Sequence, residues 1–430
     1  MIDIQFIRDN PELVKEKAAQ KGYPVEIDRL LELDTQRKDL LQAVETLRNE
    51  RNQIASDTKN KPSEQVVERG RIVKTKLSVS ENELKNLENE WQALYKKVPN
   101  MPLDYVPIGA TEDGNIVIKT VGEPTTFDFE PKSHAQIAEV KGWLDKERAA
   151  KIAGSRFAYL KGNLVRLQFA IVQYVMNTLA SERILKQIAA DNKLVVSTKP
   201  FMPVIPPAMI KTEPYEGTSR LDREEITYKI EQDDLWMNAS AEHSIVPMYM
   251  GESLDEKELP IRYIGYSTSF RREAGSYGKD MEGMFRMHQF DKLEMETFTT
   301  PETGLVEHKF LVAIQEYFMQ QLGLPYRLVE KCTADIGFAN AAGIDVETWL
   351  PGQDKYRETH SADYMTNYQA RRLKTRVKRN SGNDFVHTND ATALVLSRIP
   401  VAIMENYQTA DGDVIVPKVL RKYMDDVNKI

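Results

Sequence analysis

Two neighbouring stretches decide the fold, and the more informative one runs Phe285-Arg286-Met287-His288-Gln289-Phe290-Asp291-Lys292-Leu293-Glu294. Side chains alternate between the two faces of a β-strand, so this stretch predicts a strand with one apolar face and one polar face. The apolar face comprises Phe285, Met287, Leu293 and Met295, and the polar face comprises Arg286, Phe290 and Glu294. An aromatic ring between a guanidinium and a carboxylate can stack a base, bind a phosphate and hold an amine. A surface strand with an ion pair to its neighbour is the alternative.

The surrounding sequence predicts an α+β domain. Strand-like runs at 261–270, 285–298 and 401–407 are separated by helical stretches such as 164–188. Because the strands do not alternate strictly with helices, we expect an antiparallel sheet flanked by helices. The sequence contains neither a GxxxxGK nor a GxGxxG loop, so a nucleotide would have to be bound by other means.

The N-terminal part of the chain has a different pattern. Asn10-Pro11-Glu12-Leu13 has the features of a helix start, with an N-cap residue followed by proline. Apolar residues then recur every seven positions, at Leu33, Leu40, Leu47 and Ile54, and again at Leu77, Leu84 and Trp91 after a polar break at 57–62. This spacing predicts an antiparallel coiled-coil arm whose helices are each about 50 Å long. A coil that serves dimerisation or a scaffold is the alternative to an arm that binds another molecule.

Basic residues gather near the tip of the predicted arm. They are Lys59, Lys61, Arg69, Arg71, Lys74 and Lys76, in a stretch with few acids. This asymmetry favours contacts with phosphates, although a charge run is more often a solvated helix face. The net charge of -7 argues against indiscriminate nucleic-acid binding through overall charge, so any such contact must be local.

A proline-punctuated linker, Val98-Pro99-Asn100-Met101-Pro102, ends the helical part. We expect a first domain at 1–105, with the arm at about 27–97, and a second domain at 106–430. The single cysteine, Cys332, excludes an internal disulfide framework and a closed four-cysteine zinc site. Without an apolar leader or a membrane-length apolar run, we expect a cytoplasmic protein with no membrane partner.

Several motifs together resemble those of the class II aminoacyl-tRNA synthetases, and the match to the seryl-tRNA synthetases of bacterial type is close. Phe270-Arg271-Arg272-Glu273 and the stretch ending at Glu294 resemble motif 2, and Arg398 before 401–407 resembles motif 3. Further matches to the seryl enzymes are 4–14, Gly154-Ser155-Arg156-Phe157, Trp349-Leu350-Pro351-Gly352-Gln353 and Gln369-Ala370-Arg371-Arg372. The resemblance runs nearly from end to end and includes the arm.

The resemblance implies a site for ATP, as a substrate, together with Mg²⁺ and without zinc. Arg271 and Arg398 would be the catalytic cations, with Arg271 at the α-phosphate and Arg398 stacked on adenine opposite Phe290. Glu358 and Ser361 would help to hold Mg²⁺, which prefers hard oxygen ligands. The remaining ATP contacts would come from Arg272, Glu273, Arg286, Thr359 and His360.

The resemblance also implies a pocket for L-serine. Ser240-Ala241-Glu242 corresponds to the family's Thr-Ala-Glu triplet, and Glu294 and Thr392 would complete the pocket. Such a pocket rejects alanine, because each buried polar group left unpaired costs about 1 to 3 kcal/mol. The chain departs from the usual pattern at Ser240 and at Asp390, which stands where asparagine is usual and adds a charge near the pocket.

The implied function is that of a homodimeric enzyme that makes seryl-adenylate and transfers serine to tRNA(Ser), with tRNA(Sec) as a further candidate acceptor. Arg69, Arg71, Lys74 and Lys76 would contact the tRNA, and Pro206-Pro207 would lie at the subunit interface. One alternative is a paralogue that loads another acceptor, which the intact arm disfavours. The other is a catalytically silent binding protein, which the joint retention of the motif residues disfavours.

Overall fold

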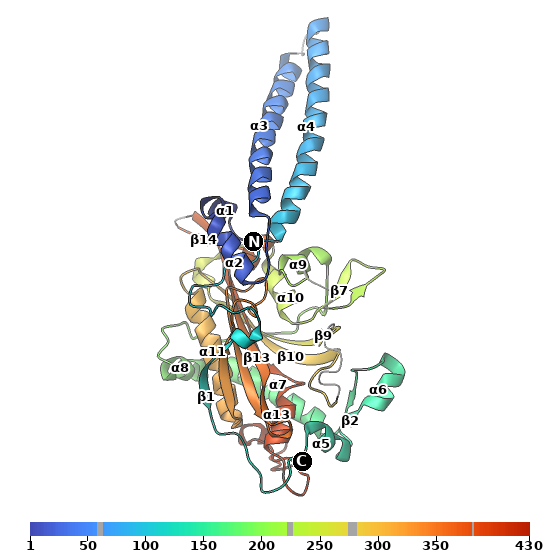
Figure 1. The fold of residues 1–430 in the computed structure, drawn as a ribbon, viewed down its shortest axis with the longest axis vertical. Helices are drawn as coiled ribbons and strands as arrows, with labels where there is room; N and C mark the ends of the chain where they lie inside the picture. Colours follow the sequence, from blue (N-terminus) through green and yellow to red (C-terminus); the bar gives the residue numbers. More distant parts are fainter. Residues whose placement is uncertain (58–62, 222–226, 274–281, 381) are drawn as a thin grey trace. The chain divides into compact units, whose positions relative to one another are not determined.

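The computed structural model describes residues 1–57, 63–221, 227–273, 282–380 and 382–430. These residues form two compact units, Met1–Met101 and Pro102–Ile430. Paired long helices dominate the first unit, and a large sheet with helices packed on it forms the second (Figure 1).

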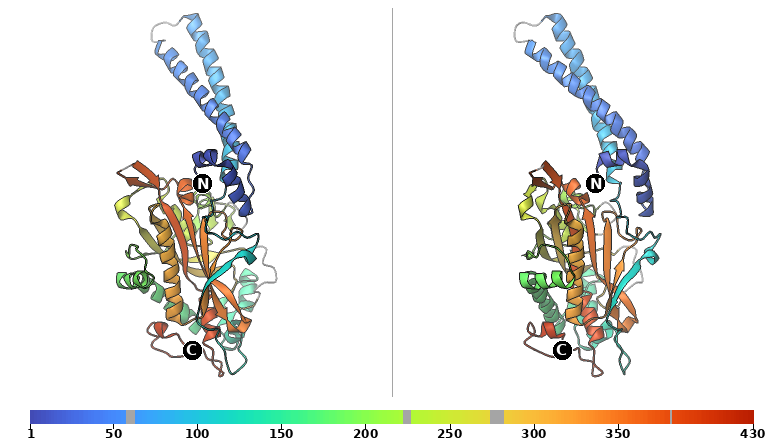
Figure 2. Two further views of the ribbon diagram at one scale, coloured as in Figure 1. Left: turned by 60° about the vertical axis from the view of Figure 1, so that its left-hand side comes forward. Right: turned by 90° about the vertical axis from the view of Figure 1, so that its left-hand side faces the viewer.

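The first unit contains four helices. They are α1 (Ile4–Asp9), α2 (Pro11–Gln20), α3 (Ile27–Asp57) and α4 (Glu64–Lys96). Helices α3 and α4 run antiparallel side by side (Figures 1 and 2) and pack through an apolar cluster around Val44, Leu77 and Leu84. The predicted antiparallel coiled-coil arm is therefore confirmed. Helix α1 was not predicted; its start is capped by Asp3, whose side chain accepts a hydrogen bond from the backbone N–H of Gln5.

The second unit is built on an eight-stranded sheet in the order β1-β11-β12-β13-β16-β10-β9-β4. Its strands are β1 (Ile116–Val121), β4 (Met202–Val204), β9 (Ile261–Phe270), β10 (Gln289–Thr299), β11 (Tyr326–Glu330), β12 (Ala342–Leu350), β13 (Lys355–Thr366) and β16 (His387–Val395). Neighbouring strands pair antiparallel throughout, apart from β4, which runs parallel to β9 at one edge. The predicted α+β fold around an antiparallel sheet is confirmed.

The main core lies between one face of this sheet and the helices that cover it. Helix α11 (Gly304–Leu322) packs across β10, β13 and β16. Leu293 and Met295 of β10 belong to this core, as does Phe310 of α11. Because side chains alternate along a strand, Glu294 and Glu296 stand on the opposite face of β10, which leaves that face for polar groups.

Smaller elements complete the second unit. The other helices are α5 (His134–Val140), α6 (Lys146–Ala153), α7 (Asn163–Leu179), α8 (Glu182–Asp191), α9 (Thr212–Gly217), α10 (Glu242–Ile245), α12 (Tyr368–Leu373), α13 (Ile399–Asn406) and α14 (Lys418–Arg421). The short strands are β2 (Leu144–Asp145), β3 (Tyr159–Leu160), β5 (Met209–Ile210), β6 (Lys229–Ile230), β7 (Leu235–Met237), β8 (Ser253–Asp255), β14 (Arg376–Arg379) and β15 (Gly382–Phe385). Short 3₁₀ turns lie at Glu112–Gly114, Val246–Tyr249, Glu256–Glu258 and Pro351–Gln353.

Three predicted elements differ from the structure. The run 401–407, interpreted as a strand, is most of helix α13, because Pro400 stands in the first turn and a short apolar run fits a buried helix equally well. The strand expected from Phe285 begins only at Gln289, so Arg286 is not placed by strand alternation. The helical stretch 164–188 is two helices, α7 and α8, separated at Ala180 and Ser181.

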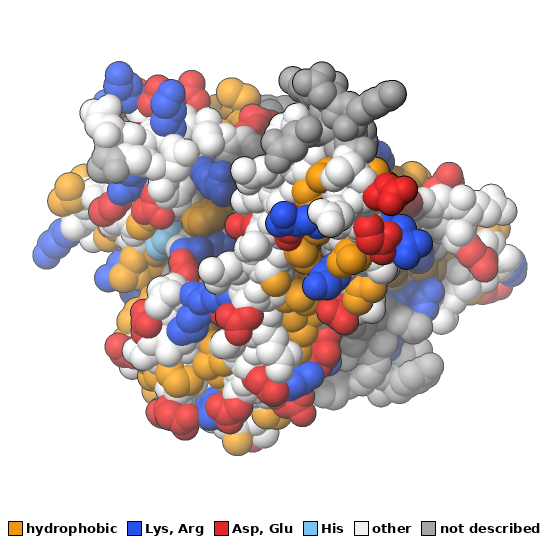
Figure 3. All heavy atoms as spheres, turned by 90° about the horizontal axis from the view of Figure 1, so that it is seen from above, with side chains coloured by type: hydrophobic (Ala, Val, Ile, Leu, Met, Phe, Trp, Pro, Cys, Tyr) orange, Lys and Arg blue, Asp and Glu red, His pale blue; other side chains and the backbone are white. Residues whose placement is uncertain are grey.

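The surface carries charges of both signs. On the face drawn in Figure 3, acidic and basic side chains are interspersed. None of the helices within the described residues has the length and apolar character needed to cross a bilayer.

Candidate active site

A polar cleft of about 290 Å³ opens on the face of the sheet opposite α11. Most of the predicted site residues line it: Ser240, Glu242, Arg271, Glu273, Arg286, Phe290, Glu294, Glu358, Thr359, Ser361, Thr392 and Arg398. They come from β10, β13 and β16 and from the segments next to β9, α10 and α13. The fold thus brings together residues that are more than a hundred positions apart in the sequence.

Arginines and aromatic rings meet at one end of the cleft. The guanidinium carbon of Arg271 lies 5.3 Å from the ring centre of Phe290, and its Nε donates to the carbonyl oxygen of Ala239 at 3.2 Å. Arg398 lies over Phe285 at 5.2 Å and donates to Glu358 Oε1 at 2.9 Å. These contacts orient two planar cations into one space, an arrangement suited to phosphate and to a stacked base.

A β-bulge shapes the neighbouring wall. In the pairing of β12 with β13, Val346 faces His360 and Glu347 faces Glu358, so Thr359 is an extra residue. The bulge explains why Glu358 and Ser361, three residues apart, both line the cleft.

The residues between them are fixed by buried hydrogen bonds. Thr359 Oγ1 lies 2.7 Å from the hydroxyl of Thr348 and 2.8 Å from Nδ1 of His360. Burial lowers the pKa of His360 to about 3, so its imidazole is neutral at pH 7. His360 does not line the cleft. Its hydrogen bond to Thr359 instead stabilises strand β13.

A buried carboxylate, Glu294, also lines the cleft. Its Oε2 accepts from the hydroxyl of Ser240 at 2.8 Å, and its Oε1 accepts from Thr392 at 3.3 Å. Lys292 forms an ion pair with the same carboxylate. An irregularity in the pairing of β10 with β16 sets Thr392 directly opposite Glu294. The result is a small pocket with hydroxyl groups and one charged acceptor.

Glu242 is held beside this pocket by two donors. Arg220 Nε and Gln369 Nε2 each donate to its Oε1 at 2.8 Å. Burial by itself would raise the pKa of Glu242, but its neighbours, Arg220 foremost and Gln369 among them, together offset this and bring the pKa down to about 2. Burial also lowers the pKa of the adjacent His243, to about 3, so Glu242 is charged and His243 neutral at pH 7.

Asp390 lines the same cleft, as its position next to the pocket residues led us to expect. Its Oδ2 is 3.5 Å from Nη2 of Arg220. Burial, reinforced by the charge of Glu242, raises the pKa of Asp390 well above its usual value. Burial and the nearby Asp390 also raise the pKa of Glu296 well above its usual value. Glu296 on β10 lies directly opposite Asp390 on β16.

Two further predicted residues lie outside the cleft lining. Ala241 is fully buried in a small apolar core. Arg272 lies over the ring of Tyr228, with its guanidinium carbon 5.3 Å from the ring centre.

Sequence reasoning missed several polar residues of the cleft lining, among them Arg220, Lys292 and Asp363, and also Glu296, which lies opposite Asp390. Lys292 and Glu296 are each two positions from Glu294, so strand alternation predicts that both lie on the same polar face as Glu294. Arg220 follows α9 and meets Glu242 only through the tertiary fold, and no signal in the sequence pointed to it.

The sheet and its arginine-carboxylate cleft define a class II aminoacyl-tRNA synthetase. Residues 227–407 match the family model of the tRNA synthetase class II core domain (G, H, P, S and T). Residues 1–102 match the model of the seryl-tRNA synthetase N-terminal domain.

Full-length relatives narrow the class to one family. The chain is 38% identical over 435 residues to the serine–tRNA ligase of Thermodesulfovibrio yellowstonii, with 99% of each chain covered. The crystal structure of the seryl-tRNA synthetase from Pyrococcus horikoshii complexed with ATP is similar with a TM-score of 0.87 at 35% identity, covering 100% of this chain and 99% of that one. The cytoplasmic serine–tRNA ligase of Naegleria fowleri in complex with AMP has a TM-score of 0.83 at 29% identity, covering 100% and 98%. The chain belongs to the seryl-tRNA synthetase family.

Proposed function

We propose that the chain activates L-serine with ATP to form seryl-adenylate and pyrophosphate, and then transfers serine to the 3′ end of tRNA(Ser), with tRNA(Sec) as a further candidate acceptor. One observation carries this proposal: a single cleft joins Arg271 and Arg398 to the pocket formed by Ser240, Glu294 and Thr392. Full-length similarity to serine–tRNA ligases supports it. The test is charging of purified tRNA(Ser) with labelled serine; charging with another amino acid instead of serine would contradict the proposal.

In the first step the serine carboxylate attacks the α-phosphorus of ATP and pyrophosphate leaves. Arg271, oriented by Ala239 and Phe290, would bind the α-phosphate and offset the charge that develops there. Arg398 and Phe290 would enclose the adenine, and Arg272, Glu273 and Arg286 would border the nucleotide. In the second step a ribose hydroxyl of tRNA attacks the serine carbonyl and AMP leaves. Because no side chain is acylated, the site contributes alignment and charge.

The oxygen atoms that Glu358 and Ser361 of β13 present to the cleft suit Mg²⁺. The Glu358 carboxylate and the Ser361 hydroxyl are hard oxygen ligands on one side of the cleft, which suits a cation that keeps several waters and binds phosphates. Bound there with ATP, Mg²⁺ would neutralise phosphate charge. Thr359 and His360, joined by their hydrogen bond, would hold this wall in register.

Serine would be bound by Glu294, Glu242 and the hydroxyl groups around them, with Ala241 packed beneath. Replacement of Ser240 by alanine removes the hydrogen bond that orients Glu294. Since a hydrogen bond to a charged group contributes about 1.5 kcal/mol, we expect kcat/KM for serine in pyrophosphate exchange to fall about tenfold, with the KM for ATP unchanged. Ser253→Ala, at an exposed position, is the matched control. An equal rise in the KM for both substrates would argue against this role for Ser240.

The first domain, 1–105, would bind tRNA through the arm, and the second, 106–430, would carry catalysis. Arg69 and Arg71 form ion pairs with Glu50 and Glu68 on the arm itself, at 2.6 and 3.2 Å. Lys74 and Lys76 are exposed on the same helix. These four residues would contact tRNA phosphates, with the two lysines contributing most. Lys59 and Lys61 lie outside the described residues.

Replacing Lys74 and Lys76 together by alanine should weaken tRNA(Ser) binding and reduce its salt dependence. Each lost phosphate contact lowers the slope of log K against log salt by about 0.7 to 0.9. Filter binding at several salt concentrations measures this slope, with Lys378→Ala, at an exposed position of the second unit, as the control. An unchanged slope in the double variant would remove these lysines from the interface.

We further propose a homodimer located in the cytoplasm. Met202, Ile205 and Met209 are 62%, 80% and 48% exposed beside the edge strand β4 and Pro206-Pro207. An edge strand with exposed apolar side chains is a surface that proteins usually cover, and a second copy of the chain would cover it. Sedimentation equilibrium is the test, and a monomer at micromolar concentration would contradict the dimer.

A further inference from the structure

Glu296 is a carboxyl group that the proposed reaction does not use. It is 0% exposed, and neither of its oxygens has a hydrogen-bond partner among the described residues. Asp390, its cross-strand neighbour, likewise has one oxygen, Oδ1, without such a partner. Buried polar groups are nearly always paired, because an unpaired one costs about 1 to 3 kcal/mol. No other side chain among the described residues supplies a donor to these three oxygens.

Acidic groups outnumber basic groups around Glu296. Asp390, Glu242 and Glu294 act on it together with a single cation, Lys292. The only other cation in contact with these carboxylates, within the part of the chain that the structure describes, is Arg220, which pairs with Glu242 and Asp390. His243 is neutral because burial lowers its pKa to about 3. Four carboxyl groups thus face two cations around Glu296.

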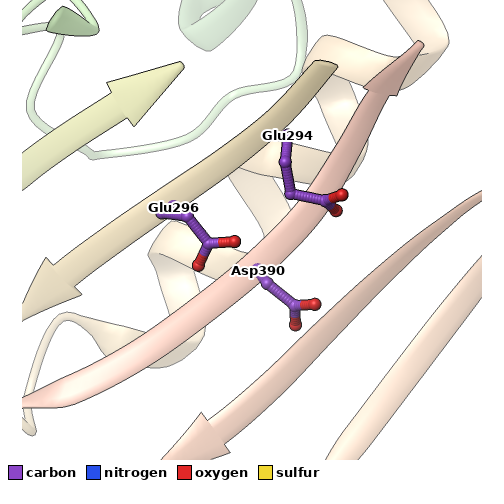
Figure 4. A group of neighbouring side chains, drawn as sticks. All are labelled: Glu294, Glu296 and Asp390. Carbon is purple, nitrogen blue, oxygen red and sulfur yellow. The ribbon is translucent and has the colours of Figure 1, made fainter. Parts of the chain in front are cut away.

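The geometry of three of these groups suits a single ion. Glu294 and Glu296 on β10 and Asp390 on β16 stand side by side on one face of the sheet (Figure 4), and each offers an oxygen within 4.8 Å of those of the other two. Two oxygens bound to one Mg²⁺, Mn²⁺ or Ca²⁺ are at most about 4 to 5 Å apart, because each metal–oxygen bond is about 2.0 to 2.6 Å long. Glu294 and Asp390 also line the cleft, so an ion has a route of entry.

We propose that Glu294, Glu296 and Asp390 form a binding site for one divalent cation of the oxygen-preferring class, separate from the Mg²⁺ expected with ATP at Glu358 and Ser361. A set of three carboxylates without nitrogen or sulfur ligands selects Mg²⁺, Mn²⁺ or Ca²⁺. The ion supplies the partner that the buried oxygens of Glu296 and the Oδ1 of Asp390 lack. It also fixes Glu294, the carboxylate proposed to hold serine.

The test is Mn²⁺ binding to the full-length protein, measured by electron paramagnetic resonance without ATP, serine or tRNA. We expect one tightly bound Mn²⁺ per chain, with affinity reduced at least tenfold in Glu296→Gln and in Asp390→Asn. Glu330→Gln, a partly buried carboxyl group on β11, and Glu358→Gln should retain the tight site. Because no substrate is present, the result is independent of the proposed ligase activity.

Thermal unfolding separates loss of the site from loss of the fold. Mn²⁺ should raise the melting temperature of the wild type and leave that of the Glu296→Gln and Asp390→Asn variants unchanged, since only an ion bound to the native state stabilises it. In a chelating buffer both variants should melt no lower than the wild type. Absence of a tight Mn²⁺ in the wild type, or equal affinity in wild type and variants, would overturn the site and would leave a proton shared between Glu296 and Asp390 as the partner.

Discussion

Replacing Arg271 by alanine is expected to reduce serine-dependent adenylate formation by a factor of about 10² to 10³, the usual effect of removing a group aimed at transition-state charge. The side chain contacts the Phe290 ring and the Ala239 carbonyl at the edge of the cleft and contributes nothing to the apolar core. The loss should therefore appear in kcat for pyrophosphate exchange, with the melting temperature nearly unchanged.

Arg398→Ala should lose activity to a similar extent, with a larger rise in the KM for ATP because this residue would stack on the base. Its ion pair with Glu358 is partly exposed, so its removal costs little stability. Arg166→Ala is the matched control, because Arg166 forms an exposed ion pair with Asp425. Exchange within threefold of the wild type in either cleft variant would refute the role assigned to that arginine.

Shortening the arm should abolish tRNA charging and leave serine activation nearly intact. The most informative variant replaces the segment from Leu41 to Asn86 by a short glycine-serine turn. Leu40 and Leu87 border the same groove, so a short turn can join the two helices there. The variant keeps the Arg8–Asp34 ion pair at 2.5 Å and the stacking of Arg37 on Trp91 at 4.4 Å, which hold the base of the first unit together.

The comparison of two assays on this variant separates the competing accounts of the arm. If the arm binds tRNA, aminoacylation should fall by at least two orders of magnitude, because contacts to several phosphates disappear together. Pyrophosphate exchange should stay within about twofold, since every proposed ATP and serine contact lies in Pro102–Ile430. Equal losses in both assays would instead favour the scaffold interpretation of the coil.

The arm and the sheet were predictable from the sequence because their patterns are periodic. Leucines at seven-residue steps predict paired helices, and alternation along 285–298 predicts a strand with one polar face, of which the part from Gln289 onward is a strand. The run 401–407 was not decidable in this way, because its apolar part, Val401 to Met404, is continuous and buried and therefore shows neither a helical nor a strand period. In that case the tertiary environment determines the structure.

The outline of the site was also predictable, through motifs that place Arg271, Glu294 and Arg398 in one cleft. Its details depend on features that carry no sequence signal. The bulge at Thr359 turns Ser361 toward the cleft, and Arg220 reaches Glu242 only in the folded chain. Predictions of charge at such a site therefore need the structure, as the excess of carboxyl groups around Glu296 demonstrates.

The most direct test of the account is ATP–pyrophosphate exchange by the wild-type protein with serine, alanine, glycine and threonine, each supplied alone and without tRNA. The pocket of Ser240, Glu294 and Thr392 predicts strong exchange with serine. For alanine and glycine it predicts a kcat/KM at least about 100-fold lower, because neither can pair with the buried hydroxyl and carboxylate groups. Exchange with alanine or glycine as efficient as with serine, or no exchange with serine at all, would contradict the central claim that this cleft activates serine.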